Sequence, residues 1–181
     1  KGTGMLVANE IDFKRYGVLK SNIERCGVRN AAVTCQSPEN LAAYYKNYFD
    51  KILVDAPCSG EGMFKKEEAA LREWSLKTVL SCAARQAKIL ESANTMLAGG
   101  GRLVYSTCTF APEEDERQIE NFLKLHSEYT LIKMKKLLPH RVKGEGHFFA
   151  ALEKAAGERA ADFSLKDIKP NDKKEFEEFK Q

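Results

Sequence analysis

The sequence lacks the patterns that mark several common classes of protein. No apolar run approaches the ~20 residues of a transmembrane helix, so we expect no membrane contact. None of the five cysteines forms a CxxC pair, which argues against a structural zinc site and against a disulfide framework. We therefore expect no metal site, and reduced thiols in a cytoplasmic protein.

The usual phosphate-binding turns are also absent. The chain contains neither GxGxxG nor GxxxxGK[ST], the glycine-rich signatures of nucleotide-binding α/β proteins. Gly99-Gly100-Gly101 does not replace them, because it follows a predicted helix and precedes a predicted strand. We interpret it as a connector that ends the helix.

Charge and histidine are both modest. A net charge of +3 permits an RNA partner without requiring one. The three histidines, His126, His140 and His147, lie in no pattern that pairs them with a thiol, which argues against a Cys–His hydrolase. At 181 residues the chain is long enough for one sizeable core and too short for two ordinary domains.

Short β-prone runs alternate with helical patterns along the chain. This alternation predicts an α/β fold with a mostly parallel sheet. Strands are expected at 5–8, 30–35, 51–55, 103–106, 129–134 and 147–152, and helices at 11–26, 39–48, within 67–98 and from Pro112 onward. The acidic run 113–116 would form the first turn of that last helix, where carboxylates suit the helix dipole. Residues 155–181 are charge-rich and are predicted to be a linker or appendage, outside a domain that spans residues 1–154.

Two cysteines occur in similar settings. Cys58 follows the run 51–55, and Cys108 follows the run 103–106. In an open α/β sheet, ligands bind beyond the carboxyl ends of the strands, so both thiols and Asp55 are expected at one sheet edge. Pro57 stiffens the turn between acid and thiol. The pattern favours nucleophilic chemistry.

The residues around these cysteines resemble two signature motifs of the Sun-type family of RNA cytosine carbon-5 methyltransferases. The motifs are Asp55-Ala56-Pro57-Cys58-Ser59-Gly60-Glu61-Gly62-Met63-Phe64 and Tyr105-Ser106-Thr107-Cys108-Thr109-Phe110. Asn9-Glu10-Ile11, Arg85-Gln86 and Gly144-Glu145-Gly146-His147-Phe148-Phe149-Ala150 extend the similarity over roughly residues 4–154. The resemblance implies a Rossmann-like methyltransferase fold, S-adenosylmethionine as cofactor and an RNA substrate, ribosomal or transfer RNA, acted on by a monomer.

The resemblance also implies a role for each site residue. Cys108 would be the nucleophile that adds to carbon 6 of cytosine, and Cys58 would help to eliminate the enzyme from the methylated base. Asp55 would favour protonation of the ring during the addition. The residues implied in cofactor binding are Glu10, at the ribose hydroxyls, together with Arg15, Ser37, Asp55 and Pro57.

The chain departs from the family pattern at two places. Ser37 stands where the family usually has an Asp near the adenine amine, and it would bind more weakly than a carboxylate. The family's first strand, its glycine-rich cofactor loop and the helix after that loop are expected upstream of Lys1. The strand would lie in the middle of the sheet. We therefore expect a partial catalytic domain, whose 181 residues alone bind the cofactor weakly at best.

Two other functions are weighed against this one. Amino-methylation of adenine or glutamine would want Asn or Asp, two prolines and an aromatic residue at the strand end, and Asp55-Ala56-Pro57-Cys58 does not supply them. The remaining alternative is a truncated domain that binds RNA or a protein partner without catalysis.

Overall fold

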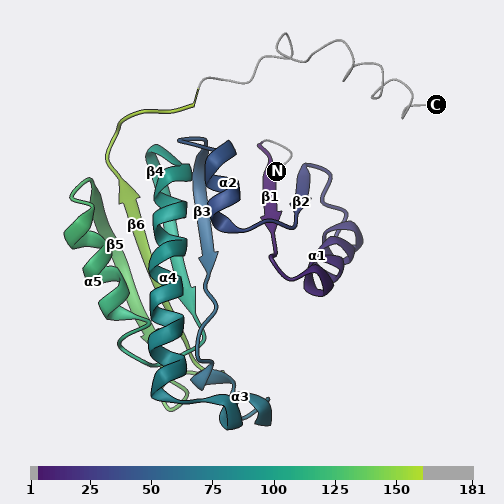
Figure 1. The fold of residues 1–181 in the computed structure, drawn as a ribbon, viewed down its shortest axis with the longest axis vertical. Helices are drawn as coiled ribbons and strands as arrows, with labels where there is room; N and C mark the ends of the chain where they lie inside the picture. The colour runs from purple at the N-terminus through teal and green to yellow at the C-terminus, as the bar shows by residue number, and fades with distance from the viewer. Residues whose placement is uncertain (1–3, 161–181) are drawn as a thin grey trace.

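The computed structural model describes residues 4–160 as an α/β fold (Figure 1). Its strands are β1 (Leu6–Asn9), β2 (Ala31–Thr34), β3 (Phe49–Asp55), β4 (Leu97–Thr107), β5 (Tyr129–Leu137) and β6 (His147–Lys154). Its helices are α1 (Phe13–Arg25), α2 (Pro38–Tyr44), α3 (Glu68–Glu73), α4 (Leu76–Met96) and α5 (Glu116–Leu125), with a 3-10 turn, η1, at Glu61–Met63. The predicted fold class is confirmed, with strand and helix alternating through β4.

The strands form two sheets within the described residues. β1 and β2 pair in parallel, and the other sheet has the order β3-β4-β6-β5, in which β3 and β4 are parallel and β6 is antiparallel to both neighbours. No hydrogen-bonded strand joins β1 to β3 between residues 4 and 160. The central strand expected upstream of Lys1 was predicted at this position in the sheet, between β1 and β3.

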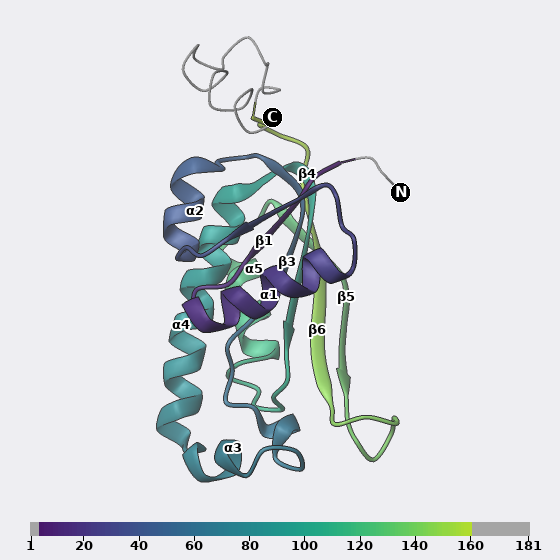
Figure 2. The same ribbon diagram turned by 90° about the vertical axis from the view of Figure 1, so that its right-hand side faces the viewer.

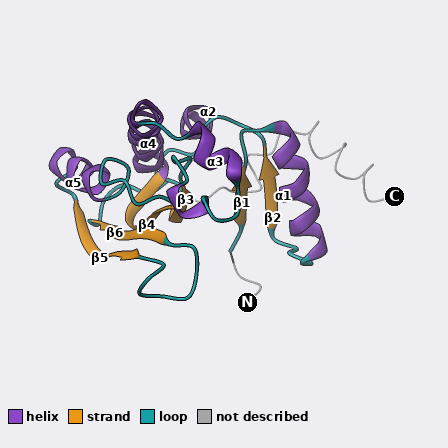
Figure 3. Ribbon diagram, turned by 90° about the horizontal axis from the view of Figure 1, so that it is seen from below, coloured by secondary structure: helices purple, strands orange, loops and turns teal. Residues whose placement is uncertain are grey.

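One face of the four-stranded sheet is covered by helices. α2, α4 and α5 lie on this face, whereas none of the described helices lies on the other (Figures 2 and 3). The core between α4, α5 and the sheet includes the fully buried Leu90, Leu103, Tyr105, Phe148 and Leu152. Alternate residues of β4 and β6 supply this core, as the two-residue period of a strand requires.

Two predicted helix boundaries were wrong. α4 ends at Met96, and Gly99-Gly100-Gly101 lies inside β4 rather than between helix and strand. A Cβ at Gly99 would overlap the backbone of Gly157, and Gly100 has a φ of +75°, so the glycines allow a close chain contact inside a strand irregularity. The helix expected from Pro112 begins at Glu116.

The start of the predicted appendage packs on the sheet. Gly99 and Gly100 donate their N–H groups to Glu158 and Ala155, and Ala160 donates its own to Asn47, at 2.7–2.9 Å. The rest of that prediction, residues 161–181, lies outside the described residues. The domain boundary at 154 stays a prediction, although β6 ends at the same residue.

Candidate active site

The two cysteine motifs meet at the carboxyl ends of β3 and β4. The strands are in register there, with Asp55 opposite Ser106, and the Ser106 hydroxyl donates to Asp55 Oδ1 at 3.2 Å. The Ala56 N–H extends the ladder by donating to the Ser106 carbonyl at 2.9 Å. Parallel pairing thus carries Cys58 and Cys108 to the same edge, as the sequence predicted.

The two thiols are in direct contact. Cys58 Sγ and Cys108 Sγ lie 3.2 Å apart, both are partly buried, and neither is in a disulfide. A hydrogen bond from the Cys58 thiol lowers the pKa of Cys108 to about 7, even though burial and the charge of Asp55 oppose this shift. The same contact, together with burial, raises the pKa of Cys58. Cys108 is therefore the thiol that ionises first, and Cys58 keeps its proton.

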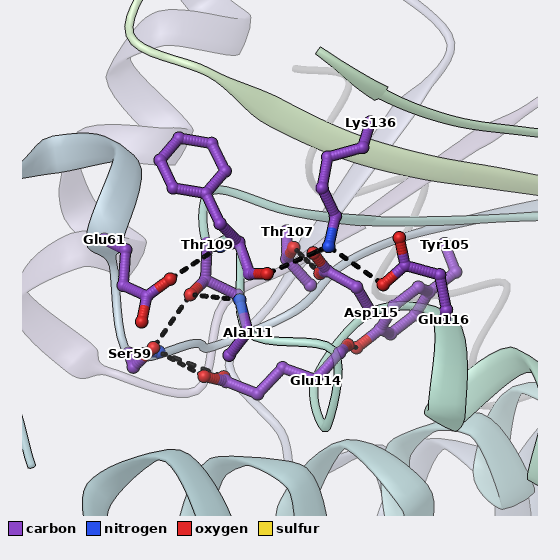
Figure 4. A network of polar contacts seen from close by, with 11 residues as sticks. Ser59, Glu61, Tyr105, Thr107, Thr109, Ala111, Glu114, Asp115, Glu116 and Lys136 are labelled. Atoms are coloured by element: carbon purple, nitrogen blue, oxygen red, sulfur yellow. Dashed lines mark hydrogen bonds and ion pairs between the residues drawn. The ribbon is translucent and has the colours of Figure 1, made fainter. Parts of the chain in front are cut away.

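Backbone and side-chain bonds tie the two cysteine loops together. The Gly62 N–H donates to the Cys108 carbonyl at 2.8 Å, and the hydroxyls of Ser59 and Thr109 lie 2.8 Å apart. Glu61 accepts the Phe110 N–H at 3.0 Å (Figure 4). A Cβ at Gly62 would lie 2.8 Å from the Cys108 carbonyl oxygen, so only glycine allows this approach.

Two acids, expected from the sequence in the first turn of the last helix, are buried in the turn before that helix. Glu114 and Asp115 have no exposed surface, because α5 begins after them and they sit in the preceding turn. Asp115 accepts from Thr107 Oγ1 at 2.6 Å and pairs with Lys136 Nζ at 2.9 Å. Lys136 also donates to the Phe110 carbonyl and to Glu116 (Figure 4). These groups fix the residues on both sides of Cys108.

Burial and the bonds to neighbouring groups have opposite effects on the pKa values of this cluster. Burial raises the pKa of Asp115 to about 6, against the opposing effects of Thr107 and Lys136. For Lys136, burial alone would lower the pKa, but the bonds to Glu116 and Asp115 raise it. One signal in the sequence could have revealed Asp115: it lies four and seven residues before Ile119 and Phe122, on the stripe that faces the core.

The residues predicted to bind a cofactor fall into two groups. Glu10 follows β1, pairs with Arg15 at 3.0 Å and accepts the Asp12 N–H at 3.1 Å. Ser37 follows β2 and caps α2 by accepting the Asn40 N–H at 3.2 Å. Asp55 and Pro57 lie instead beside the thiols, at the end of β3. Arg15 lies in the first turn of α1, and the others lie at or just after the carboxyl ends of parallel strands, but the structure brings only Asp55 and Pro57 to the cysteine pair.

A hollow of about 430 Å³ adjoins the thiol site on the helix-free face of the sheet. It is lined by Leu53, Asp55, Val104, Ser106, His147 and Phe149. Residues 4–160 contain no cluster of His, Cys, Asp and Glu side chains that could bind a metal ion. Within the same range, no helix is long and apolar enough to span a bilayer.

Comparison with known proteins gives a consistent family. The sequence profile described as "16S rRNA methyltransferase RsmB/F" matches residues 1–153. The "Ribosomal RNA small subunit methyltransferase F" of Vibrio vulnificus (strain YJ016) is 48% identical over 121 residues, which are 67% of this chain and 25% of that protein. Its counterpart in Aeromonas salmonicida (strain A449) is 44% identical over 138 residues, 76% of this chain and 29% of that protein. The chain thus spans about a quarter of the length of these relatives.

Solved structures show the same fold. The crystal structure of PH0851 superposes with a TM-score of 0.80 at 29% identity, covering 84% of this chain and 37% of that one. NSun6 from Pyrococcus horikoshii, solved with SFG, gives a TM-score of 0.75 at 28% identity, covering 86% of this chain and 42% of that one. The Rossmann-like methyltransferase fold expected from the sequence is confirmed.

Proposed function

The chain belongs to the RsmB/F family of 16S rRNA methyltransferases, and we propose that it supplies the catalytic residues for methylation of carbon 5 of cytosine in RNA. The observation that carries the proposal is the contact between Cys58 and Cys108, with Sγ atoms 3.2 Å apart. One thiol is poised to ionise near neutral pH while its neighbour stays protonated. Such a pair suits a reaction that needs a nucleophile and, later, a proton acceptor.

Cys108 acts first in the proposed reaction. Its thiolate adds to carbon 6 of cytosine, and the electron pair of the 5,6 double bond shifts into the ring so that carbon 5 becomes nucleophilic. Asp55 holds the polar edge of the base and favours its protonation as the thiolate adds. S-adenosylmethionine, when bound, supplies the electrophilic methyl group that carbon 5 attacks.

Release requires the second thiol. Carbon 5 then carries both a methyl group and a hydrogen, and loss of that hydrogen as a proton restores the double bond and expels the Cys108 thiolate. Cys58, 3.2 Å from the departing sulfur, gives its own proton to solvent before this step and, as a thiolate, accepts the proton from carbon 5. Removal of the two thiols should therefore have opposite effects on the covalent protein–RNA complex. Without Cys108 the complex does not form, and without Cys58 it accumulates.

The cofactor-facing residues fit the chemistry of S-adenosylmethionine. Each carboxylate oxygen of Glu10 accepts one bond in the structure and can accept another from a ribose hydroxyl. Arg15 holds that carboxylate in place. The Ser37 hydroxyl, which accepts at the helix cap, still has its proton to donate to the adenine ring. We propose ribosomal RNA as the substrate, because the relatives carry that name.

The test is a methyl-incorporation assay, made in the full-length parent protein, that also detects a covalent protein–RNA complex. Cys108→Ala should abolish both methyl transfer and the denaturation-resistant complex, with cofactor affinity unchanged within a few-fold. Cys58→Ala should instead accumulate the complex. Methylation by Cys108→Ala within a few-fold of the unsubstituted protein, or an equal complex with both variants, would refute the assignment. RNA binding by an unsubstituted protein that methylates neither ribosomal nor transfer RNA would favour a non-catalytic domain.

A further inference from the structure

Two buried polar side chains hold the peptide groups on either side of Cys58. Gln86 Nε2 donates to the Pro57 carbonyl at 2.9 Å. The Ser59 N–H donates to Glu114 Oε2 at 3.0 Å, with Oε1 at 3.3 Å (Figure 4). Neither Gln86 nor Glu114 has any exposed surface. Hydrogen bonds from buried side chains therefore fix Pro57 and Ser59, the residues before and after Cys58.

Gln86 and Glu114 are also bonded to each other. Gln86 Nε2 donates to Glu114 Oε2 at 2.8 Å, which joins α4 to the turn before α5. The Tyr105 hydroxyl donates to the Glu114 carbonyl at 2.7 Å, so the turn itself is anchored to β4. These bonds link α4, the turn before α5, and β4 on the buried side of the Cys58 loop.

The carboxylate of Glu114 is a costly group to bury. Burial raises its pKa, and no basic side chain of residues 4–160 forms an ion pair with it. Its charge also raises the pKa of Cys108, which opposes formation of the nucleophile. The buried position of the Glu114 carboxylate is therefore not explained by a role in activating Cys108. Its side-chain contacts point to the loop of Cys58 instead.

We propose that Glu114 and Gln86 are positioning residues for Cys58. By fixing the Pro57 carbonyl and the Ser59 amide they keep the Cys58 thiol against Cys108, and so serve the release step of the proposed function, on which this inference rests. Neither residue touches the reacting atoms. The requirement is for a buried acceptor at residue 114 and a buried donor at residue 86.

The first test measures the position of Cys58 without the reaction. In a Cys108→Ala background, the rate at which N-ethylmaleimide modifies Cys58 is followed by mass spectrometry of the peptide. Glu114→Met and Gln86→Met should each speed modification at least about tenfold, because each removes a hydrogen bond to a peptide group beside Cys58 together with the bond between Gln86 and Glu114. Glu114→Gln should stay within about threefold, because its amide oxygen can still accept from Ser59. Glu113→Met is the matched control, since the partly exposed Glu113 side chain pairs with Arg117 rather than with the Cys58 loop.

The second test measures release in the protein with both thiols present. Glu114→Met and Gln86→Met should increase the covalent RNA complex several-fold, with cofactor affinity unchanged within about twofold. Unchanged Cys58 modification in folded variants, or equal loss of complex formation and turnover, would overturn the proposal. If Glu114→Met does not fold, Gln86→Met alone decides, because it leaves the Ser59–Glu114 bond intact. If Cys58→Ala accumulates no complex, the proposed function fails, while the modification rates still judge the positioning role.

Discussion

At the scale of single residues, the site depends on an inequality between two chemically identical side chains. Cys58 and Cys108 occupy equivalent strand ends, yet the contact between them favours ionisation of one and opposes ionisation of the other. The inequality arises because one thiol can donate its proton toward the sulfur of its partner, which stabilises a single negative charge on the pair. Removal of the donor should therefore change the titration of the thiol that remains.

The first prediction concerns the pH dependence of Cys108. Its reaction with iodoacetamide should accelerate as pH rises through about 7, because the thiolate is the reactive form. Cys58→Ala should move this midpoint upward, since it removes the hydrogen bond that stabilises the thiolate. Modification of the Cys108 peptide, measured from pH 5 to pH 10, gives the midpoint. Cys26→Ala, at the exposed end of α1, is the control, and a midpoint that does not move in Cys58→Ala contradicts the prediction.

The second prediction concerns Glu10. Glu10→Ala should weaken binding of S-adenosylmethionine by roughly 1–3 kcal/mol, the usual scale for a lost hydrogen bond to a charged group. Calorimetric titration of the complete domain, including the glycine-rich cofactor loop, measures the change. Glu24→Ala, which removes an exposed carboxylate of α1, should leave the dissociation constant unaltered. Equal affinities for the Glu10 and Glu24 variants would show that Glu10 does not contact the cofactor.

At the scale of secondary-structure elements, the turn before α5 organises the cysteine loops. Because α5 begins only at Glu116, Glu114 and Asp115 lie in the turn before it, where their side chains are buried. β5 contributes Lys136, whose ammonium group reaches Asp115 and Glu116 across the gap between strand and helix. Residues of α4, β4 and β5 thus all bond to this turn. Thr107 and Phe110, on either side of Cys108, bond to Asp115 of the turn and to Lys136.

The third prediction tests this arrangement. Lys136→Met should destabilise the chain by about 3–5 kcal/mol at pH 8, because it leaves the buried Asp115 carboxylate without its cation. The folded pKa of Asp115, about 6, exceeds its ordinary 3.8, so protonation favours the folded state and this contribution is lost as pH rises through about 6. The loss in Lys136→Met should accordingly be smaller at pH 5 than at pH 8. Urea unfolding at both pH values measures it, with exposed Lys133→Met as control. Equal losses at both pH values would contradict the role of the Asp115 charge.

At the scale of the whole molecule, the helices of residues 4–160 cover one face of the four-stranded sheet and leave its other face without a helix. On the helix-free face and at the edge of β3, Leu53 is 70% exposed and lies beside Val104 and Phe149 in the hollow next to Asp55. Within residues 4–160, the β1 side of β3 has no strand bonded to it. An unpaired edge with apolar side chains favours association with other chains.

The fourth prediction follows from this exposed edge. The 181-residue chain by itself should self-associate as concentration rises, and Leu53→Lys should reduce the association, because a charge on an edge strand opposes pairing. Sedimentation velocity over a range of concentrations measures the effect. Leu125→Lys is the control, since Leu125 is equally exposed, at 74%, but lies at the end of α5 on the opposite face. An equal reduction by both variants would show that net charge, rather than the β3 edge, controls association.

Sequence reasoning succeeded where the signal was local. The apolar runs before Cys58 and Cys108 predicted parallel strands, and parallel strands bring their carboxyl ends to one edge. It failed at the ends of elements. Gly99-Gly100-Gly101 has the composition of a connector, but the contact with Gly157 that makes Gly99 necessary comes from a segment more than fifty residues later.

The sequence by itself determined the α/β class, the pairing of two cysteine motifs and the acid beside one of them, because each depends on neighbouring residues and on strand periodicity. Only the tertiary structure decided that the sulfurs touch, that Gln86 bonds the buried Glu114, and that Lys136 pairs with Asp115. Those contacts join residues 20 or more positions apart. Whether a carboxylate faces water or a buried donor depends on how the elements pack, and local sequence does not encode that packing.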